Sequence, residues 1–168
     1  MALTDKEEKI LDSIIVASEN DPDKPEFPPD DPKFPATPTY KIKVPEFVDV
    51  WLKDESHNKT GTHKDRMAWE MIVTYKEFLK SKKAGKIDKL PILSILSSGS
   101  AALAIQTQLK KYGLPNVYVL MDSQTDPSII DNLKKVGCKI FLEDLSKKTF
   151  DWEEILRLTD NEEGFDIT

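Results

Sequence analysis

The sequence predicts an α/β protein whose main part is a three-layer, Rossmann-like unit built on a parallel β-sheet. From residue 89 onward, short apolar segments alternate with amphipathic segments of helical length. Two of the amphipathic segments end at Gly113 and Gly137, where a left-handed cap is expected to close a helix. Strand–helix–strand units of this length imply parallel strands joined by right-handed crossovers.

The first element is a predicted helix over residues 4–18. Thr4 and Glu7 have the spacing of a capping box, in which each side chain bonds a backbone N–H of the other residue. The apolar residues of this segment recur with helical period and fall on one face: Ile10, Leu11, Ile14 and Ile15. The segment is therefore expected to pack against the body through that face.

A proline-rich segment follows, with seven prolines between residues 22 and 38. Proline fixes φ and removes a backbone donor, so a regular helix or sheet is excluded there. Phe27, Phe34 and Tyr40 give the segment apolar anchors. This favours an extended arm, wrapped over the body or over a partner subunit, although a disordered linker is the alternative.

The central part of the chain reads as a strand, a loop and a long helix. Residues 40–52 alternate in a strand-like pattern, and residues 54–62 form a polar loop. Apolar residues at helical spacing then predict a helix over 63–83, with Thr62 as its N-cap and Gly85 just beyond its end.

The remaining elements complete the alternating pattern of the first paragraph. Predicted strands cover 91–96, 116–121 and 139–142, and predicted helices cover 101–112, 127–136 and 152–158. These segments are short and bounded by turn residues, as expected for buried parallel strands and their crossover helices.

The composition excludes several classes of protein. The net charge of −6 and the pI near 5.0 argue against a nucleic-acid surface, which carries a basic patch. Cys138 is the only cysteine, so an internal disulfide and a cysteine-rich zinc site are excluded. His57 and His63 are the only histidines, and no Asp/Glu/His spacing indicates a metal site.

The chain also shows no sign of membrane association or secretion. Its first residues are charged and lack the apolar core of a signal peptide. No run of 18 apolar residues occurs, so no membrane span is expected. We therefore expect a cytoplasmic protein.

A serine-rich loop, residues 97–100, is the first candidate site. It follows a predicted strand and leads directly into a helix, and ligands of open parallel sheets bind outside the carboxyl ends of the strands. Unpaired N–H groups and the helix dipole favour an anion there, and Gly99 lets the backbone approach a ligand closely. A serine-rich helix cap without a ligand is the alternative.

Lys64 is the second candidate. It lies in the first turn of the predicted long helix, directly after a polar loop that contains Gly61. A cation there opposes the helix dipole, so the position is unfavourable for a merely structural lysine and suits an amine that forms a Schiff base. Asp65 and Arg66 are expected to pair with neighbouring segments and fix the helix start. A surface lysine that reaches into water is the alternative.

Four motifs resemble those of a known family. Lys53-Asp54-Glu55, followed by Lys59-Thr60-Gly61-Thr62-His63-Lys64-Asp65-Arg66, resembles Lys-x-Glu and then Pro-Thr-Gly-Ser-Phe-Lys-Asp-Arg of the fold-type-II pyridoxal phosphate (PLP) enzymes. Threonine synthase, threonine dehydratase, cysteine synthase and the tryptophan synthase β subunit belong to that family. Thr37-Pro38 resembles the family's opening Thr-Pro-Leu, residues 97–104 its Ser-Ser-Gly-Asn-Thr-Gly-x-Ala loop, and residues 133–138 its Leu-x-x-x-Gly-Ala segment.

The resemblance implies a fold, a cofactor and a set of site residues. The fold would be the tryptophan synthase β-like PLP fold, of which this chain holds the N-terminal half. Lys64 would bind PLP covalently and move the Cα proton of a small amino-acid substrate. The loop Ser97, Ser98, Gly99, Ser100 and Ala101 would hold the substrate carboxylate, and Ser100 would also contact the cofactor. The implied reaction is a β- or γ-elimination or replacement by a threonine synthase-like lyase or synthase.

The resemblance also implies three parts of the chain and a missing one. Residues 1–39 would form the N-terminal helix and arm, 40–88 part of the large domain with the PLP lysine, and 89–168 a small α/β domain. The family holds the PLP phosphate in a glycine-rich loop of its later half, and none of the six glycines here is adjacent to another. A complete site would therefore need a missing C-terminal half or a partner chain, and a homodimer is possible because many relatives are dimers.

Several positions depart from the family pattern. Ser100 replaces an asparagine, Ala102 a glycine, Lys59 a proline and His63 a phenylalanine. A histidine before the lysine is typical of the tryptophan synthase β subunit, whereas residues 64–67 favour threonine synthase. The serine and the short chain also allow a non-catalytic ligand-binding or regulatory protein that retains the fold. A further alternative is an assembly module that acts through its proline-rich arm.

Overall fold

The computed structural model describes residues 3–15, 36–47, 49–147 and 149–167. Its elements, in chain order, are α1 (Asp5–Ser13), β1 (Thr39–Ile42), β2 (Val50–Lys53), the 3-10 helix η1 (Glu55–His57), α2 (Lys64–Lys83), β3 (Leu93–Leu96), α3 (Ser100–Tyr112), β4 (Tyr118–Asp122), α4 (Pro127–Val136), β5 (Lys139–Glu143), α5 (Trp152–Leu158) and β6 (Phe165–Asp166). Residues 16–35 lie outside the described residues, and they include most of the expected proline-rich arm and the end of the helix expected over 4–18.

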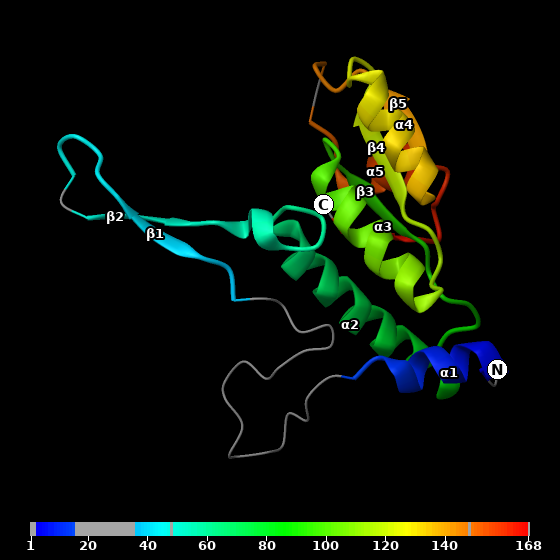
Figure 1. The fold of residues 1–168 in the computed structure, drawn as a ribbon. Helices are drawn as coiled ribbons and strands as arrows, with labels where there is room; N and C mark the ends of the chain where they lie inside the picture. Colours follow the sequence, from blue (N-terminus) through cyan, green and yellow to red (C-terminus); the bar gives the residue numbers. More distant parts are fainter. Residues whose placement is uncertain (1–2, 16–35, 48, 148, 168) are drawn as a thin grey trace.

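A four-stranded parallel sheet forms the centre of the molecule, in the order β5-β4-β3-β6 (Figure 1). Helices α3 and α4 cover one face of the sheet, and α5 packs on β3 and β6 from the other face. Because successive side chains of a strand point to opposite faces, Leu93 and Ile95 face α3 while Ser94 faces α5. The expected three-layer α/β unit with parallel strands is thereby confirmed.

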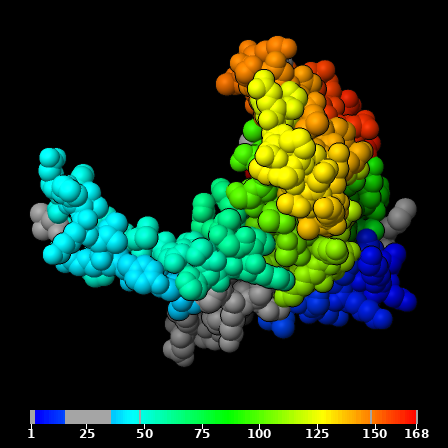
Figure 2. All heavy atoms as spheres, turned by 45° about the horizontal axis from the view of Figure 1, so that its top comes forward, coloured from blue at the N-terminus to red at the C-terminus, as the bar shows by residue number. Residues whose placement is uncertain are grey.

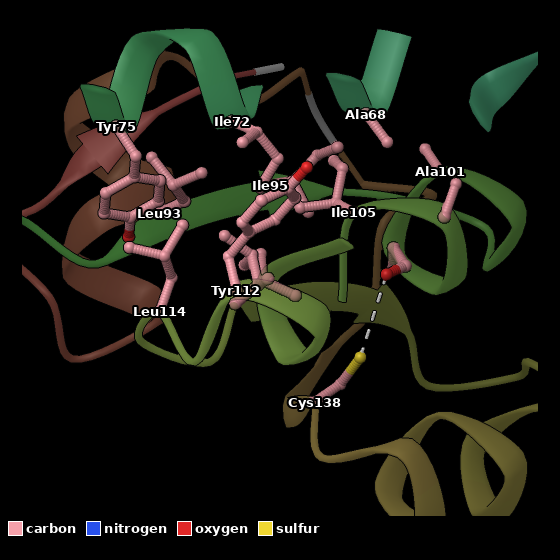
Figure 3. Close-up of a cluster of buried hydrophobic side chains, with 14 of the residues drawn as sticks. Ala68, Ile72, Tyr75, Leu93, Ile95, Ala101, Ile105, Tyr112, Leu114 and Cys138 are labelled. Atoms are coloured by element: carbon pink, nitrogen blue, oxygen red, sulfur yellow. Dashed lines mark hydrogen bonds between the residues drawn. The ribbon is translucent and has the colours of Figure 1, made fainter. Parts of the chain in front are cut away.

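The long helix α2 packs along α3, and Figure 1 shows the two helices side by side in the same direction. Ala68, Ile72 and Tyr75 of α2 are fully buried and point toward the sheet and α3 (Figure 3). The Tyr75 hydroxyl donates to the Pro91 carbonyl at 2.8 Å, which satisfies its one polar group inside the core. Helix α2 is therefore held firmly against the α/β unit.

The N-terminal helix is anchored to α2 by a nearly buried ion pair. The expected capping box is confirmed: the Thr4 side chain accepts from the Glu7 N–H, and the Glu7 carboxylate accepts from the Thr4 N–H at 2.9 Å. The Lys82 ammonium donates to the other oxygen of Glu7 at 2.6 Å. The described helix ends at Ser13, earlier than expected, because Ile14 leaves helical geometry.

The strand-like run over residues 40–52 is folded back on itself as an antiparallel hairpin of β1 and β2. A turn over residues 44–47 separates the two strands, with Pro45 at its second position and Glu46 at a φ of 72°. The alternation of side chains is the same in one long strand or two short ones, so only the turn distinguishes them. Figure 2 shows that the hairpin projects away from the body.

Strand β6 has no counterpart among the expected strands. Its two residues pair with the start of β3, and a buried network supports the chain that leads to it. Asn161 Nδ2 donates to Ser94 Oγ at 2.7 Å and to the Ile92 carbonyl at 3.0 Å, and the hydroxyls of Ser94 and Thr159 are 2.8 Å apart. A Cβ on Gly164 would lie 2.0 Å from Asn161 Nδ2, so only glycine fits beside this network.

Candidate functional site

The loop before α2 is shaped by hydrogen bonds to the helix start. Gly61 has a φ of 79° and donates its N–H to the Asn58 carbonyl at 2.9 Å, which closes a tight turn. The buried Asp65 carboxylate accepts from the backbone N–H and the hydroxyl of Thr60, at 2.8 and 2.7 Å. Thr62 Oγ1 accepts from the Lys64 N–H at 3.1 Å, although His63 rather than Thr62 is the N-cap. Lys64 is thus the first residue of α2, half-buried and preceded by a fixed loop.

Glu55 is the centre of a second cluster around this helix start. Its carboxylate accepts from Arg66 Nε at 2.9 Å, Asn58 Nδ2 at 2.6 Å and Thr37 Oγ1 at 2.6 Å. The Arg66 guanidinium, followed by the Thr37 hydroxyl, lowers the pKa of Glu55 to about 2. The expectation that Asp65 and Arg66 pair with neighbouring segments is therefore confirmed.

Thr37 joins the hairpin to the same cluster. The Lys53 ammonium donates to the Thr37 carbonyl at 2.7 Å, while the Thr37 hydroxyl donates to Glu55. Thr37 itself is buried. Two of the motifs that carry the resemblance, Thr37-Pro38 and Lys53-Asp54-Glu55, thus meet in space. Neither was assigned a role from the sequence, since their contact spans 16–18 residues; their presence in the resemblance was the available signal.

The serine loop at the carboxyl end of β3 has two structural and two exposed positions. Ser97 is buried, and its hydroxyl accepts from the Gly99 N–H at 3.1 Å, which curls the loop. Gly99 has a φ of 132°, and a Cβ there would lie 3.0 Å from Ile129 Cγ2. Ser98 and Ser100 are exposed. Their hydroxyls, with the unpaired N–H groups of the first turn of α3, form the part of the loop that can bind a ligand.

The two candidate segments lie at the same end of the structure. Lys64 begins α2 and Ser100 begins α3, and these helices pack side by side in the same direction. Ala68, about one turn into α2, and Ala101, the second residue of α3, lie near each other in Figure 3. Both are alanines, so the two helix starts approach closely. The positive ends of two helix dipoles therefore point toward one region.

A cavity of about 380 Å³ lies beside the serine loop. Ser98, Gly99 and Ser100 form its polar side, and the apolar side comes from α3 and α4: Leu103, Ile129 and Leu133, with Asn132 at its margin. Lys64 does not line this cavity. The structure thus places Ser98, Gly99 and Ser100 around one space, and Lys64 at the neighbouring helix start rather than in the cavity wall.

The described part of the chain contains no cluster of three or more His, Cys, Asp or Glu side chains that could hold a metal ion. None of its helices is long and apolar enough to cross a membrane.

Comparisons with known proteins define the class to which this fold and site belong. The model of the family described as "Pyridoxal-phosphate dependent enzyme" matches residues 33–163. The chain belongs to this family, whose cofactor is pyridoxal phosphate. A cysteine synthase of Aquifex aeolicus (strain VF5) is 30% identical in an alignment 114 residues long, which covers 64% of this chain and 33% of that protein. The chain therefore spans about a third of the length of this curated relative.

Solved structures show the same fold. Maize serine racemase superposes on 82% of this chain and 40% of its own, with a TM-score of 0.56 and 21% identity. A pyridoxal 5'-phosphate-dependent aspartate racemase covers 80% of this chain and 40% of its own, with a TM-score of 0.56 and 19% identity. O-ureido-L-serine synthase covers 78% and 40%, with a TM-score of 0.54 and 20% identity. The expected tryptophan synthase β-like fold is confirmed.

The residues at the two helix starts fit part of a PLP site. A primary amine on a structured helix start suits the cofactor aldehyde. Helix N-termini with exposed hydroxyls suit the negative charges of a phosphate or a carboxylate. Gly99 has a φ of 132°, which side-chain-bearing residues rarely adopt, and this angle shapes the loop. The groups at the two helix starts are therefore an amine, hydroxyls and backbone N–H groups. These groups suit PLP, which is an anionic aldehyde, and the carboxylate of an amino acid.

Proposed function

We propose that this chain forms the N-terminal portion of a PLP-dependent synthase or lyase that acts on a small amino acid. Lys64 would hold the cofactor, and the loop Ser97, Ser98, Gly99, Ser100 and Ala101 would hold the substrate carboxylate. The proposal rests on one observation: the starts of α2 and α3 lie at the same end of the structure, in a chain that belongs to this family. The division into residues 1–39, 40–88 and 89–168 is part of the same proposal.

Each residue has a distinct task in this proposal. Bound PLP would supply the electron sink that makes a substrate Cα proton acidic. Lys64 would take up that proton at its Nζ atom and return it later. The Ser98 and Ser100 hydroxyls and the N–H groups at the start of α3 would orient the carboxylate. Ser97 would act indirectly, because its hydroxyl holds the Gly99 N–H and so shapes the loop.

The reaction would be an elimination or replacement at the β- or γ-carbon. The 30% identity to a cysteine synthase supports replacement at the β-carbon. Residues 64–67, Lys-Asp-Arg-Met, support the threonine synthase-like alternative. The two differ in the position of the leaving group, so a pair of amino acids activated at Oβ or Oγ would distinguish them.

A complete site would need residues that this chain does not supply. No two of its glycines are adjacent, so the glycine-rich phosphate loop of the family has no counterpart here. A C-terminal half or a partner chain would supply that loop, and a homodimer is part of this proposal. The isolated 168-residue chain is expected to be inactive and to hold PLP only through Lys64 and Ser100, without a phosphate loop.

Trapping with borohydride tests the role of Lys64. The chain is incubated with substoichiometric PLP and reduced, and the labelled peptides are mapped by mass spectrometry. We expect Lys64 to carry several times more label than Lys59, which lies in the same loop region. Lys59 is exposed and Lys64 half-buried, so accessibility alone would give the opposite order. Label that simply follows exposure, with Lys64 at or below Lys59, would overturn the proposal.

A cofactor-free amino-acid binding protein is the second candidate. The cavity beside Ser98, Gly99 and Ser100 has an apolar wall and does not include Lys64, which favours binding that does not require the amine. Calorimetry with amino acids distinguishes the two candidates. Binding that is equally strong in the wild-type chain and in Lys64→Ala, without PLP, would favour this second function.

A further inference from the structure

Strand β5 forms one edge of the parallel sheet, and no strand among the described residues pairs with its outer side. Its register with β4 runs without a bulge from Lys139 to Glu143, and the strand contains no proline. Bulges and prolines are two of the means by which proteins prevent an edge strand from pairing with another chain. Neither protects β5, so its outer side can accept a further strand.

The hydrogen bonds toward β4 show which backbone groups of β5 remain available. The Lys139 N–H and the Glu143 carbonyl both bond residues that flank β4, at 3.1 and 2.8 Å. The backbone groups of successive residues point to opposite sides of a strand. The odd-numbered residues of β5 therefore bond β4, and the N–H and carbonyl groups of Ile140 and Leu142 point outward from the free edge.

The side chains of β5 also alternate, between the two faces of the sheet. The Phe141 ring lies 5.6 Å from the ring of Tyr118, between ring centroids, so Phe141 shares that face of the sheet with Lys139 and Glu143. Ile140 packs against the core on the opposite face. Leu142, on the same face as Ile140, is 48% exposed, which leaves apolar surface at the edge.

The lysine of this edge strand is folded along the sheet. A lysine that extends past an edge strand opposes pairing with another strand. The Lys139 ammonium instead lies over the rings of Tyr118 and Phe141, at 4.3 and 4.9 Å from their centroids. Cation–π attraction holds it there. The outer backbone groups of β5 therefore stay accessible.

The edge is complementary to a second copy of itself. In an antiparallel pair, residues whose backbone groups point outward must oppose each other. A two-fold axis at Phe141 meets this condition, because it sets Ile140 opposite Leu142 of the second copy. The same axis sets Lys139 opposite Glu143, twice by symmetry, and opposite charges on facing residues stabilise a sheet. Moving the axis to Ile140 or Leu142 keeps the backbone phase but separates both charge pairs.

We propose that β5 pairs with β5 of a second copy of this chain, antiparallel about a two-fold axis at Phe141. The two four-stranded sheets would then form one continuous sheet. Ile140 and Leu142 of both copies would form an apolar strip across the junction on one face, and the two Phe141 rings would lie opposite each other on the other face. The strands of the two copies run in opposite directions, so the two serine loops would lie at opposite ends of the joined sheet. The inference therefore goes beyond the proposed function and does not depend on it.

The interface is small. A stable interface buries about 800 Å² on each partner, which one strand of this length does not supply. We therefore expect a dimer that dissociates on dilution and that salt weakens, because two charge pairs select its register.

Charge exchange across the pair tests the register. The dissociation constant of the 168-residue chain is measured by sedimentation over a concentration series. Lys139→Glu or Glu143→Lys should raise this constant about tenfold, because each change places like charges opposite each other in both pairs. The double variant Lys139→Glu/Glu143→Lys should recover most of the wild-type affinity. Lys134→Glu makes the same change of charge at an exposed position of α4 and is the matched control. Circular dichroism checks that each variant is folded.

Cysteine cross-linking tests the position of the axis. In the proposed register Phe141 faces its own copy in a non-hydrogen-bonded pair, with Cα atoms about 4.5 Å apart, which a disulfide can span. Glu143 faces Lys139 and lies far from Glu143 of the second copy. With oxidised glutathione, Phe141→Cys should therefore form disulfide dimers several times faster than Glu143→Cys. Glu143 is exposed and Phe141 half-buried, so random collisions would give the opposite order. The native Cys138 is buried and adds little background.

Four results would overturn the inference. They are a chain that stays monomeric at every concentration, a dimer that Lys139→Glu leaves unchanged, a double variant no tighter than the single ones, and faster cross-linking of Glu143→Cys. Borohydride labelling of the same chain separates the two proposals. A dimer with the expected charge and cross-linking behaviour, but no preference of PLP for Lys64 over Lys59, would refute the proposed function and support the pairing of β5.

Discussion

The close approach of α2 and α3 can be tested by enlarging one alanine in their contact. Ala68 is fully buried on the face of α2 that points toward Ala101 and Ile105 (Figure 3). Ala68→Leu adds three carbon atoms where the two helices meet. The helix starts that carry Lys64 and the serine loop should then move apart.

The expected cost follows from the packing. Overfilling a close-packed interior costs about 1–3 kcal/mol. For a chain of this size each kcal/mol lowers the thermal midpoint by about 2–4 °C, so Ala68→Leu should lower it by roughly 2–12 °C. Glu70→Leu introduces the same side chain at an exposed position of α2 and should change the midpoint little.

Two measurements check this prediction. Circular dichroism gives the thermal midpoint, and borohydride labelling gives the ratio of PLP on Lys64 to PLP on Lys59. We expect Ala68→Leu to lower both and Glu70→Leu to lower neither. An Ala68→Leu protein with the midpoint and labelling ratio of the wild type would refute the view that tight helix packing positions the amine.

Three further changes address the surrounding structure. Glu7→Gln should destabilise the protein by about 1.5–3 kcal/mol at pH 7, because Lys82 donates to this carboxylate. Since Lys82 and the Thr4 N–H lower the pKa of Glu7 from 4.5 to about 2, the difference from wild type in urea unfolding should shrink as the pH falls through that interval. Gly99→Ala should cost about 1–3 kcal/mol in urea unfolding, because its φ is positive and the new Cβ meets Ile129. Glu55→Gln should reduce the selectivity of PLP labelling for the first residue of α2, and unchanged selectivity in peptide mapping would contradict its positioning role.

The sequence predicted the elements whose pattern is repeated and local. The strands and helices from residue 64 to 158 lie within a few residues of their expected bounds, because buried strands, helical spacing and terminal glycines all indicate the same boundaries. Strand β6 was missed because two residues, one of them Asp166, are too few for a pattern. The hairpin was read as one strand, although Pro45 could have indicated a turn.

The site was only partly predictable, for a related reason. Lys64 and residues 97–100 stand out because each lies beside a helix start and belongs to a recognisable motif. The bonds of Glu55 to Thr37 and Arg66 join positions 18 and 11 residues apart, and no local spacing encodes them. The separation of Lys64 from the cavity depends on how α4 packs beside α3, which the sequence does not specify.

The hydrogen bonds around Thr37 connect the base of the hairpin to the beginning of α2. Thr37 is tied to Lys53 on one strand and through Glu55 to Arg66 on the helix, so the base of the hairpin cannot tilt without pulling on the turn before Lys64. A molecule that binds the far end of the hairpin would therefore change the orientation of the Lys64 amine.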